Sequence, residues 1–152
     1  MSDHIVKAYD DDLAALKSML SQMGGLAEEQ LARSIDALVR RDTKLADAVI
    51  QADEKIDAME IAIEEKAVLT IAKRQPMAKD LRNIIVAIRI AADIERIGDL
   101  AKNIAKRSHA IYDAMPQRLT KGLARLGDLS QAQVKLVLDA FAASDADKAM
   151  DV

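Results

Sequence analysis

The sequence predicts an all-α fold, because apolar residues recur at intervals of three and four along almost the whole chain and no segment alternates convincingly with period two. The composition supports this prediction. Apolar residues make up 51% of the chain, yet only Tyr9, Tyr112 and Phe141 are aromatic. A core of Leu, Ile, Val, Ala and Met, surrounded by many charged residues, favours helices over strands.

The first two helices are predicted over about 5–40 and, after a cap at Asp42 or Thr43, to about Arg74. The apolar stripe of the first continues in phase through Gly24-Gly25, so we expect one long helix that is bent or loosened at the glycines. Asp42 or Thr43 is suited to cap the second helix. The dipeptide Gln75-Pro76 ends it, because proline disfavours helical geometry at the residue before it.

Three further helices are predicted over about 77–113, over about 117–143, and from near Ala146. Pro76 is suited to the first turn of the first of these. That helix carries two apolar stripes, which indicates packing on two sides. One stripe is Leu81, Ile85, Ile88 and Ala92, and the other is Ile90, Ile94, Ile97, Ala101 and Ile104.

An internal repeat appears when the sequence is shifted by 103 positions. The shift aligns not only apolar residues but also less common ones, namely Tyr9-Asp10 with Tyr112-Asp113, Gly24 with Gly127, Asp36 with Asp139 and Asp42 with Asp145. The second copy reaches only the start of its second helix. We therefore expect a fragment of a longer chain, with a fourth helix whose apolar face lacks partners of its own.

Composition excludes several classes of function. The chain has no cysteine, so a disulfide framework, a thiol nucleophile and a cysteine-ligated metal are excluded. The net charge of −3 argues against nucleic-acid binding through a basic field. There is no signal-peptide pattern and no apolar run near the length that spans a bilayer, so we expect a cytoplasmic protein. His4 and His109 are expected to be ordinary surface residues.

A pattern of paired acids is the main candidate for a site. Glu95 and Asp99 lie four residues apart, so their carboxylates share one helix face, in phase with the stripe from Leu81 to Ala92. Asp53 and Asp57 have the same spacing on the preceding helix. If the two helices are antiparallel neighbours, four carboxylates converge near mid-bundle, and such a set suits a hard cation.

Two alternatives remain at this point. The acids face solvent or form ordinary salt bridges, for which Lys55, Arg96 and Lys102 lie near enough in sequence. Gly98, inside the same helix, indicates close approach of either another backbone or a ligand, and a packing role explains it equally well.

The turn before the third helix is the second candidate. It places Lys79 and Arg82 near a helix N-terminus, where they are suited to bind an anion or an acidic partner. The alternative is simply a well-formed helix start. No catalytic motif occurs: a di-iron site of the Glu-x-x-His type is disfavoured because Lys106 precedes His109 by three positions.

The same segments resemble the PhoU family of phosphate-uptake and phosphate-signalling regulators. The resemblance rests on the run from Gln75 to Arg82, on Asp93-Ile94-Glu95-Arg96-Ile97-Gly98-Asp99, and on Asn103-Ile104-Ala105. The start of the chain, from His4-Ile5 through Tyr9-Asp10 to Leu16, and the motif Asp53-x-x-Ile56-Asp57 are also similar to the family. The likeness covers the entire chain.

The resemblance implies two three-helix bundles in tandem, with long antiparallel helices. Here residues 1–113 are the first bundle and residues 114–152 are the incomplete start of the second. It also implies a metal at Glu95 and Asp99, to which the spacing argument adds Asp53 and Asp57 as expected ligands. The expected ion is a divalent or trivalent cation: manganese, magnesium, iron or zinc. The second repeat lacks the helix that carries its own metal motif.

The implied function is regulatory and non-enzymatic. Family members restrain the phosphate-starvation response by acting between the ATPase subunit of a phosphate ABC transporter and a sensor histidine kinase. We expect a homo-oligomer, a dimer, that meets membrane complexes only peripherally and binds no nucleic acid. Lys79 and Arg82 are the expected partner-binding residues. The alternative is a helical structural or oligomerisation module without metal or ligand.

Overall fold

The computed structural model describes residues 2–111 and 116–152, with side chains from residue 8 onward except those of residues 112–115 and 117. Within these ranges the chain is helical, without strands, as predicted. The helices are α1 (Ser2–Arg40), α2 (Thr43–Arg74), α3 (Lys79–Ile111), α4 (Gln117–Ala143) and the short α5 (Ala146–Met150). No helix in the described part is long and apolar enough to cross a membrane.

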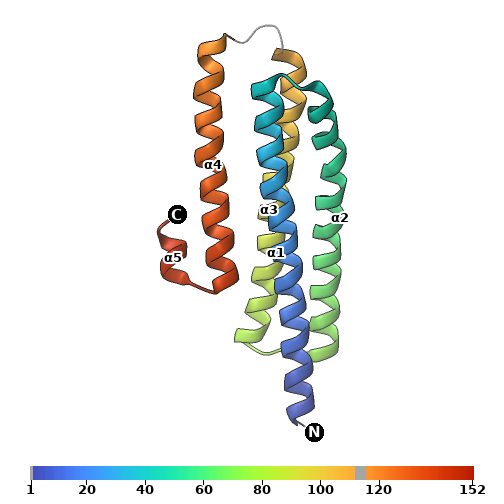
Figure 1. Cartoon of the computed structure of the whole chain (residues 1–152). Coiled ribbons are helices and arrows are strands. Elements are labelled where there is room, and N and C mark those ends of the chain that lie inside the picture. The colour runs from blue at the N-terminus through green and yellow to red at the C-terminus, as the bar shows by residue number, and fades with distance from the viewer. Residues whose placement is uncertain (1, 112–115) are drawn as a thin grey trace.

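Helices α1, α2 and α3 pack on one another as a three-helix bundle in which successive helices are antiparallel (Figure 1). Short turns near Arg41 and Gln75 join them, as predicted. The core is aliphatic with one methionine, and its fully buried large side chains are those of Leu16, Leu20, Met23, Ile56, Ile63 and Ile84. Helix α1 is continuous through Gly24-Gly25, so the glycines do not interrupt it.

The turn between α2 and α3 differs from the prediction. Gln75 adopts the left-handed conformation and closes α2 through a hydrogen bond from its N–H to the Ile71 carbonyl. Ala78 also has a positive φ, of 44°, and such a residue does not continue a right-handed helix. Helix α3 therefore begins at Lys79, and Pro76 lies in the turn before it rather than in its first turn.

The buried face of α3 also differs from the first predicted stripe. The buried residues are Ile84, Ala87, Ala91, Ile94, Gly98, Ala101, Ala105 and Ser108. Leu81 and Ile85 are 36% and 39% exposed, and Ala92 is exposed. Six of these eight residues are small, which suits a helix against which both α1 and α2 pack. The predicted end of this helix at 113 and the predicted domain division at 113/114 lie outside the described residues, as do Tyr112 and the side chain of His4.

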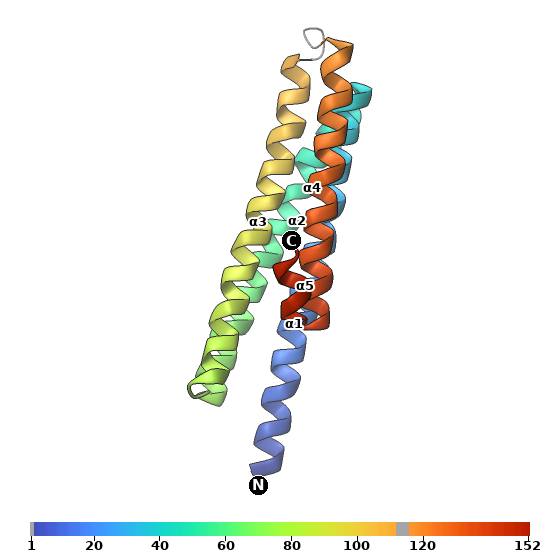
Figure 2. The same ribbon diagram turned by 90° about the vertical axis from the view of Figure 1, so that its left-hand side faces the viewer.

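Helix α4 is not without a partner, contrary to the sequence expectation. It runs antiparallel to α1 and packs along the C-terminal part of that helix (Figure 2). Lys17 donates a hydrogen bond to Ser144 Oγ at 2.7 Å, and Leu138 and Phe141 pack against the bundle core. Part of the apolar face stays exposed, since Leu119, Leu126 and Leu129 are 51%, 60% and 57% accessible.

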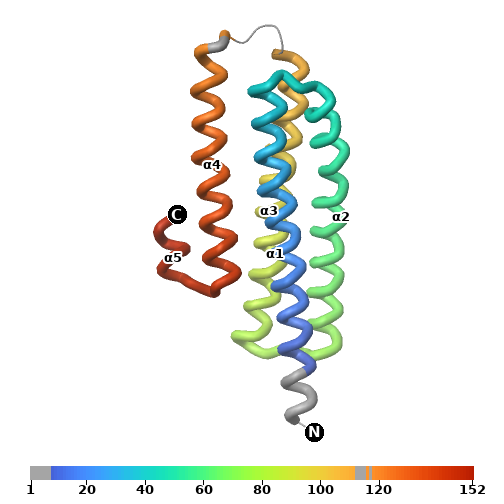
Figure 3. The backbone as a smooth tube through the Cα atoms, viewed as in Figure 1, coloured from blue at the N-terminus to red at the C-terminus, as the bar shows by residue number. Residues whose placement is uncertain are grey.

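The repeat in the sequence is reproduced in backbone geometry. Arg41 and Ser144 both adopt the left-handed conformation, with φ of 58° and 54°. The N–H groups of Asp42 and Asp145 then donate to the carbonyls of Ala37 and Ala140, each at 2.9 Å. Asp42 and Asp145 are the N-caps of α2 and α5. Each carboxylate accepts a hydrogen bond from the backbone N–H three residues later, that of Leu45 or of Lys148. Helix α5 then turns back beside α4 (Figure 3).

Candidate functional site: the acidic seam between α2 and α3

Five carboxylates and one lysine lie along the contact between α2 and α3, and we call this set the acidic seam. Its members are Asp53, Asp57 and Glu60 of α2 and Glu95, Asp99 and Lys102 of α3. All four acids predicted from the sequence belong to it. Asp53 is buried, with 2% of its surface exposed, and the other acids are half-buried.

Lys102 joins the two sides of the seam. Its ammonium pairs across the helix contact with Asp53 Oδ2 and lies 3.3 Å from Asp99 Oδ1 on its own helix. Only 25% of the Lys102 side chain is exposed. The hydrogen bond to Asp53 raises the pKa of Lys102 above its ordinary value, and this effect exceeds the opposing effect of burial. The lysine therefore stays charged at neutral pH.

Gly98 sets the spacing of the seam. A Cβ atom at this position would lie 2.9 Å from Ile56 Cδ1 and 3.5 Å from Asp53 Oδ1. A side chain on Gly98 would therefore displace the fully buried Ile56 side chain of α2. Of the two explanations open from the sequence, the structure shows close packing, with a side chain of α2 as the close neighbour.

The remaining acids of the seam repel one another. Burial raises the pKa of the Glu95 carboxyl, and the charges of Asp99, Glu60, Asp57 and Asp53 raise it further. The pKa of Asp57 is also raised, first by burial and then by Asp53, while Lys102 partly offsets the shift. One lysine therefore compensates only part of the negative charge.

The donor chemistry fits a hard cation, because carboxylate oxygens are what such ions take as ligands. The arrangement around Lys102 fits less well. Over the described part of the chain, no three His, Cys, Asp or Glu side chains come together closely enough to hold a metal ion. A metal between Asp53 and Asp99 would have to displace Lys102. Of the three cations considered from the sequence, Lys102 forms the salt bridges, while Lys55 and Arg96 are exposed.

The turn that carries Lys79 and Arg82 lies at the other end of α3 from His109. Both basic residues are exposed, and Met77 beside them is 81% exposed. The Tyr9 hydroxyl donates to the Asp80 carbonyl oxygen at 3.0 Å and so ties this turn to α1. The Arg82 N–H donates to the Ala78 carbonyl oxygen. The turn is thus held by hydrogen bonds that do not need the Lys79 or Arg82 side chains.

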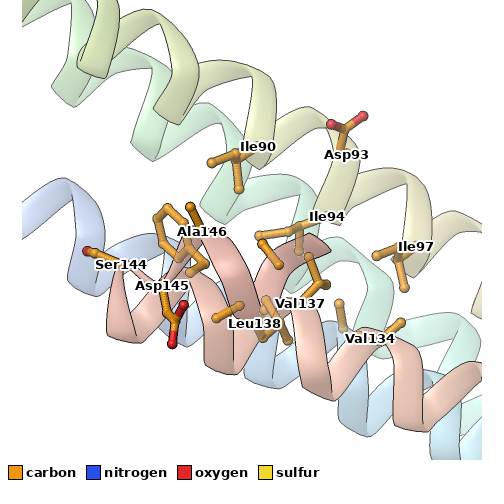
Figure 4. Close-up of a pocket in the computed structure, with 15 residues that line it drawn as sticks. Ile90, Asp93, Ile94, Ile97, Val134, Val137, Leu138, Ser144, Asp145 and Ala146 are labelled. Carbon is orange, nitrogen blue, oxygen red and sulfur yellow. The ribbon is translucent and has the colours of Figure 1, made fainter. Parts of the chain in front are cut away.

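An apolar groove of about 470 Å³ separates α3 from α4 and was not predicted. In Figure 4, Ile90, Ile94 and Ile97 of α3 face the side of α4 that carries Val134, Val137 and Leu138. The first three residues of the second predicted stripe therefore line this groove, whereas Ala101 is buried within the bundle. In the described ranges the backbones of α3 and α4 do not approach closely, and α4 reaches the bundle through α1. The groove holds no paired acids of the seam.

The fold and site define a class of protein: an all-helical bundle with an internal repeat, an acidic seam in its first bundle, and a second repeat whose first helix packs on the first helix of the chain. The comparisons with known proteins then show the family. Residues 20–108 match the family model described as the PhoU domain, and the chain belongs to that family.

Relatives and a solved structure extend the match beyond that domain. The chain is 49% identical over 150 residues to a phosphate-specific transport system accessory protein PhoU homolog of Rhizobium meliloti, covering 98% of this chain and 63% of that protein. It is 37% identical to the PhoU accessory protein of Escherichia coli K12, covering 100% of this chain and 63% of that protein. The crystal structure of PhoU from Pseudomonas aeruginosa matches with a TM-score of 0.89 and 38% identity, covering 94% of this chain and 69% of that one.

Proposed function

We propose that this protein regulates phosphate uptake and phosphate-starvation signalling as a negative regulator that acts through contacts rather than turnover. The observation that carries the proposal is that the chain belongs to the PhoU family. Almost the whole chain aligns with relatives named as accessory proteins of phosphate-specific transport. Since the chain spans 63% of the length of the Rhizobium meliloti relative, the activity of the whole protein is part of the proposal.

The proposed partners are the ATPase subunit of a phosphate ABC transporter and a sensor histidine kinase. The protein is cytoplasmic in this proposal and meets membrane complexes only from their soluble side. The exposed Lys79 and Arg82 support a docking role for the turn before α3, because rim charges steer and orient association with an acidic surface. The net charge of −3 supports the absence of nucleic acid among the partners.

A binding measurement tests the docking role of this turn. Purified ATPase subunit and the cytoplasmic part of the kinase are titrated with the wild-type chain, with Arg82→Ala and with Lys79→Ala. Arg89→Ala is the matched control, because Arg89 is also an exposed arginine of α3, two turns further along. We expect both turn variants to bind at least one partner several-fold more weakly than the control. Equal affinity for all variants rejects the turn as a docking site, and no binding by the wild type rejects both partners.

The protein is further proposed to bind manganese, magnesium, iron or zinc at Glu95 and Asp99, with Asp53 and Asp57. The raised pKa values of Glu95 and Asp57 support this proposal, because they report negative charge that a cation would compensate. Thermal melting with each metal should stabilise the wild type but not the variant Glu95→Gln/Asp99→Asn, which keeps the side-chain shapes. An equal metal response in both proteins would show that binding occurs elsewhere.

A homodimer is the proposed assembly. The support is the part of α4 that α1 does not cover, where Leu119, Leu126 and Leu129 remain more than half exposed. Full burial of such a side chain from water is worth about 1.5–3 kcal/mol, and these three leucines, about half exposed, would gain roughly half of that each, so contact between two copies is favoured. Sedimentation at micromolar concentration decides this point, and a clean monomer counts against the dimer.

A second candidate function, a helical module without metal, is favoured by one specific observation. Lys102 already places a positive charge between Asp53 and Asp99, so this position holds a cation without any metal ion. Native mass spectrometry separates the two candidates, because it reports bound metal and subunit number together.

A further inference from the structure

Asp53 is the most deeply buried acid of the acidic seam. Its carboxylate lies between two helices with 4% of the side chain exposed, and an ionised carboxylate in such a place needs a positive partner. The partner is Lys102 of the facing helix, whose ammonium also contacts Asp99 one turn before it. The three residues thus connect α2 to α3 beside Gly98, where the Ile56 and Asp53 side chains of α2 lie against α3.

We propose that Lys102 is the resident counter-cation of the acidic seam: a tethered ammonium that holds the position between Asp53 and Asp99 and that any metal ion must displace. The lysine then has two effects. It keeps the first bundle folded without metal, and it lowers the affinity of the seam for external cations. The second effect rests on the metal site proposed above, whereas the first does not.

The surroundings of Lys102 support this assignment over an ordinary surface ion pair. Exposed pairs contribute little, because water screens them and two long side chains lose freedom. Here Asp53 is almost completely buried and Lys102 is 25% exposed. Removing one member of such a pair leaves the other charge without compensation, which is strongly destabilising. The exposed pair of Arg40 and Asp36, 70% and 53% accessible, shows the contrast.

A double-mutant cycle tests the first effect. Lys102→Met removes the charge but keeps most of the side-chain volume, and Lys106→Met is the control, because Lys106 is an exposed lysine one turn further along α3. In metal-free buffer we expect Lys102→Met to lower Tm by roughly 5–10 °C and Lys106→Met to change it by about 1 °C or less. In an Asp53→Asn background the same Lys102→Met change should cost far less, and Lys102→Arg should retain most of the stability.

The first effect is overturned if Lys102→Met lowers Tm no more than Lys106→Met does. It is also overturned if Lys102→Met lowers Tm equally with Asp53 and with Asn at position 53. Should Lys102→Met fail to fold, the comparison of Asp53→Asn with Asp53→Asn/Lys102→Met still decides, because neither protein contains the buried charge. A large loss from Lys102→Met in that neutral background would show a packing role instead.

Titration with Mn²⁺ and Mg²⁺ tests the second effect, with KCl used to match ionic strength. We expect either ion to raise Tm more in Lys102→Met than in the wild type, with at least a tenfold lower Kd for the variant. An equal Kd in the two proteins overturns the competition. If neither protein responds, the competition and the proposed metal site are both rejected, while the coupling of Lys102 to Asp53 is judged by the cycle alone.

Discussion

Leu138 of α4 packs directly over Gly24 of α1, so that a Cβ atom on Gly24 would lie 2.5 Å from Leu138 Cδ2. The contact has a counterpart at the other end of the same helix pair. A Cβ atom on Gly127 of α4 would lie 2.7 Å from Ile35 Cγ2 of α1. The internal repeat aligns Gly24 with Gly127 and Ile35 with Leu138. The two repeats therefore meet through reciprocal contacts of one branched side chain on one glycine.

Alanine substitutions at these glycines should separate close packing from helix propensity. A Cβ atom added to Gly25 or Gly122 would have no neighbouring atom within 4 Å, so Gly25→Ala and Gly122→Ala should stabilise the protein by about 0.5–1 kcal/mol. Gly24→Ala and Gly127→Ala should lose this gain and cost about 1–3 kcal/mol more than their controls, because the side chains opposite must move. Chemical denaturation measures all four.

The Gly127 variant should be the worse of the two. Ile35 meets it with atoms next to its branched Cβ, which are stiff, whereas Leu138 meets Gly24 mainly with its terminal methyl groups. Leu138→Ala should therefore relieve the added cost of Gly24→Ala in a double mutant. Equal stability of Gly24→Ala and Gly25→Ala would contradict the packing of α4 on α1.

Asp12 should make the stability of the first bundle depend on pH. Its carboxylate pairs with Lys66 and with Arg74 Nε at 3.0 Å, and the hydrogen bond from Lys66 is the main reason that its pKa lies below the ordinary value of 3.8. The lowered folded-state pKa means that the contribution is complete above about pH 3.8 and is lost as pH falls below it. At pH 7, Asp12→Asn should cost about 1–3 kcal/mol.

The control for this measurement is Asp11→Asn, since Asp11 is exposed and adjacent in sequence. Urea unfolding from pH 7 down to pH 2 should show the two variants converging in stability at the acidic end. A constant difference across that range would mean that the Asp12 charge is not what holds α1 to α2.

Ionisation of Glu95 should change stability in the opposite direction to ionisation of Asp12. The pKa of Glu95 lies above the ordinary value of 4.5, first because of burial and then because of Asp99, so the folded state binds the proton more tightly than the unfolded state. Ionised Glu95 therefore destabilises the fold as pH rises through and above about 4.5. In metal-free buffer, Glu95→Gln should raise the free energy of unfolding at pH 7 by about 0.5 kcal/mol. The gain is this small because Glu95 is partly exposed and solvent screens the repulsion.

This gain should disappear well below pH 4.5, where wild-type Glu95 is protonated. Glu65→Gln is a suitable control, because Glu65 is exposed on α2 and does not belong to the seam. A loss of stability on Glu95→Gln at neutral pH would indicate that Glu95 has a positive partner rather than repelling neighbours.

The helices and their order were predictable from the sequence, since period, caps and proline mark them. Residue type restricted the cap of α2 to Asp42 or Thr43, and the structure shows Asp42; the cap at Asp145, which was not predicted, is of the same residue type. The start of α3 was not predictable, because Ala78 adopts a positive φ that its residue type disfavours. Tertiary contacts such as Tyr9 to the Asp80 carbonyl hold that turn.

The acidic residues of the site were predictable from the sequence, but the side chain that compensates their charge was not. Spacing placed Asp53 with Asp57, and Glu95 with Asp99, on one face of each helix, and this follows from helix geometry. That the two faces meet depended on the packing of α2 against α3, which the structure shows. Spacing did not distinguish Lys102 from Lys55 or Arg96 as the compensating cation, because that depends on which side of α3 faces Asp53. Nor did spacing predict that α4 packs on α1, because the contacts between these two helices join residues more than 90 positions apart in the sequence.

The proposed restraint of the phosphate-starvation response is tested most directly in a bacterial strain that lacks its own PhoU and carries a phosphate-responsive reporter. Expression of this chain in phosphate-rich medium should return the reporter to its repressed level, and Arg82→Ala should restore less repression than Arg89→Ala. A reporter that stays fully active while the folded chain accumulates would contradict the claim.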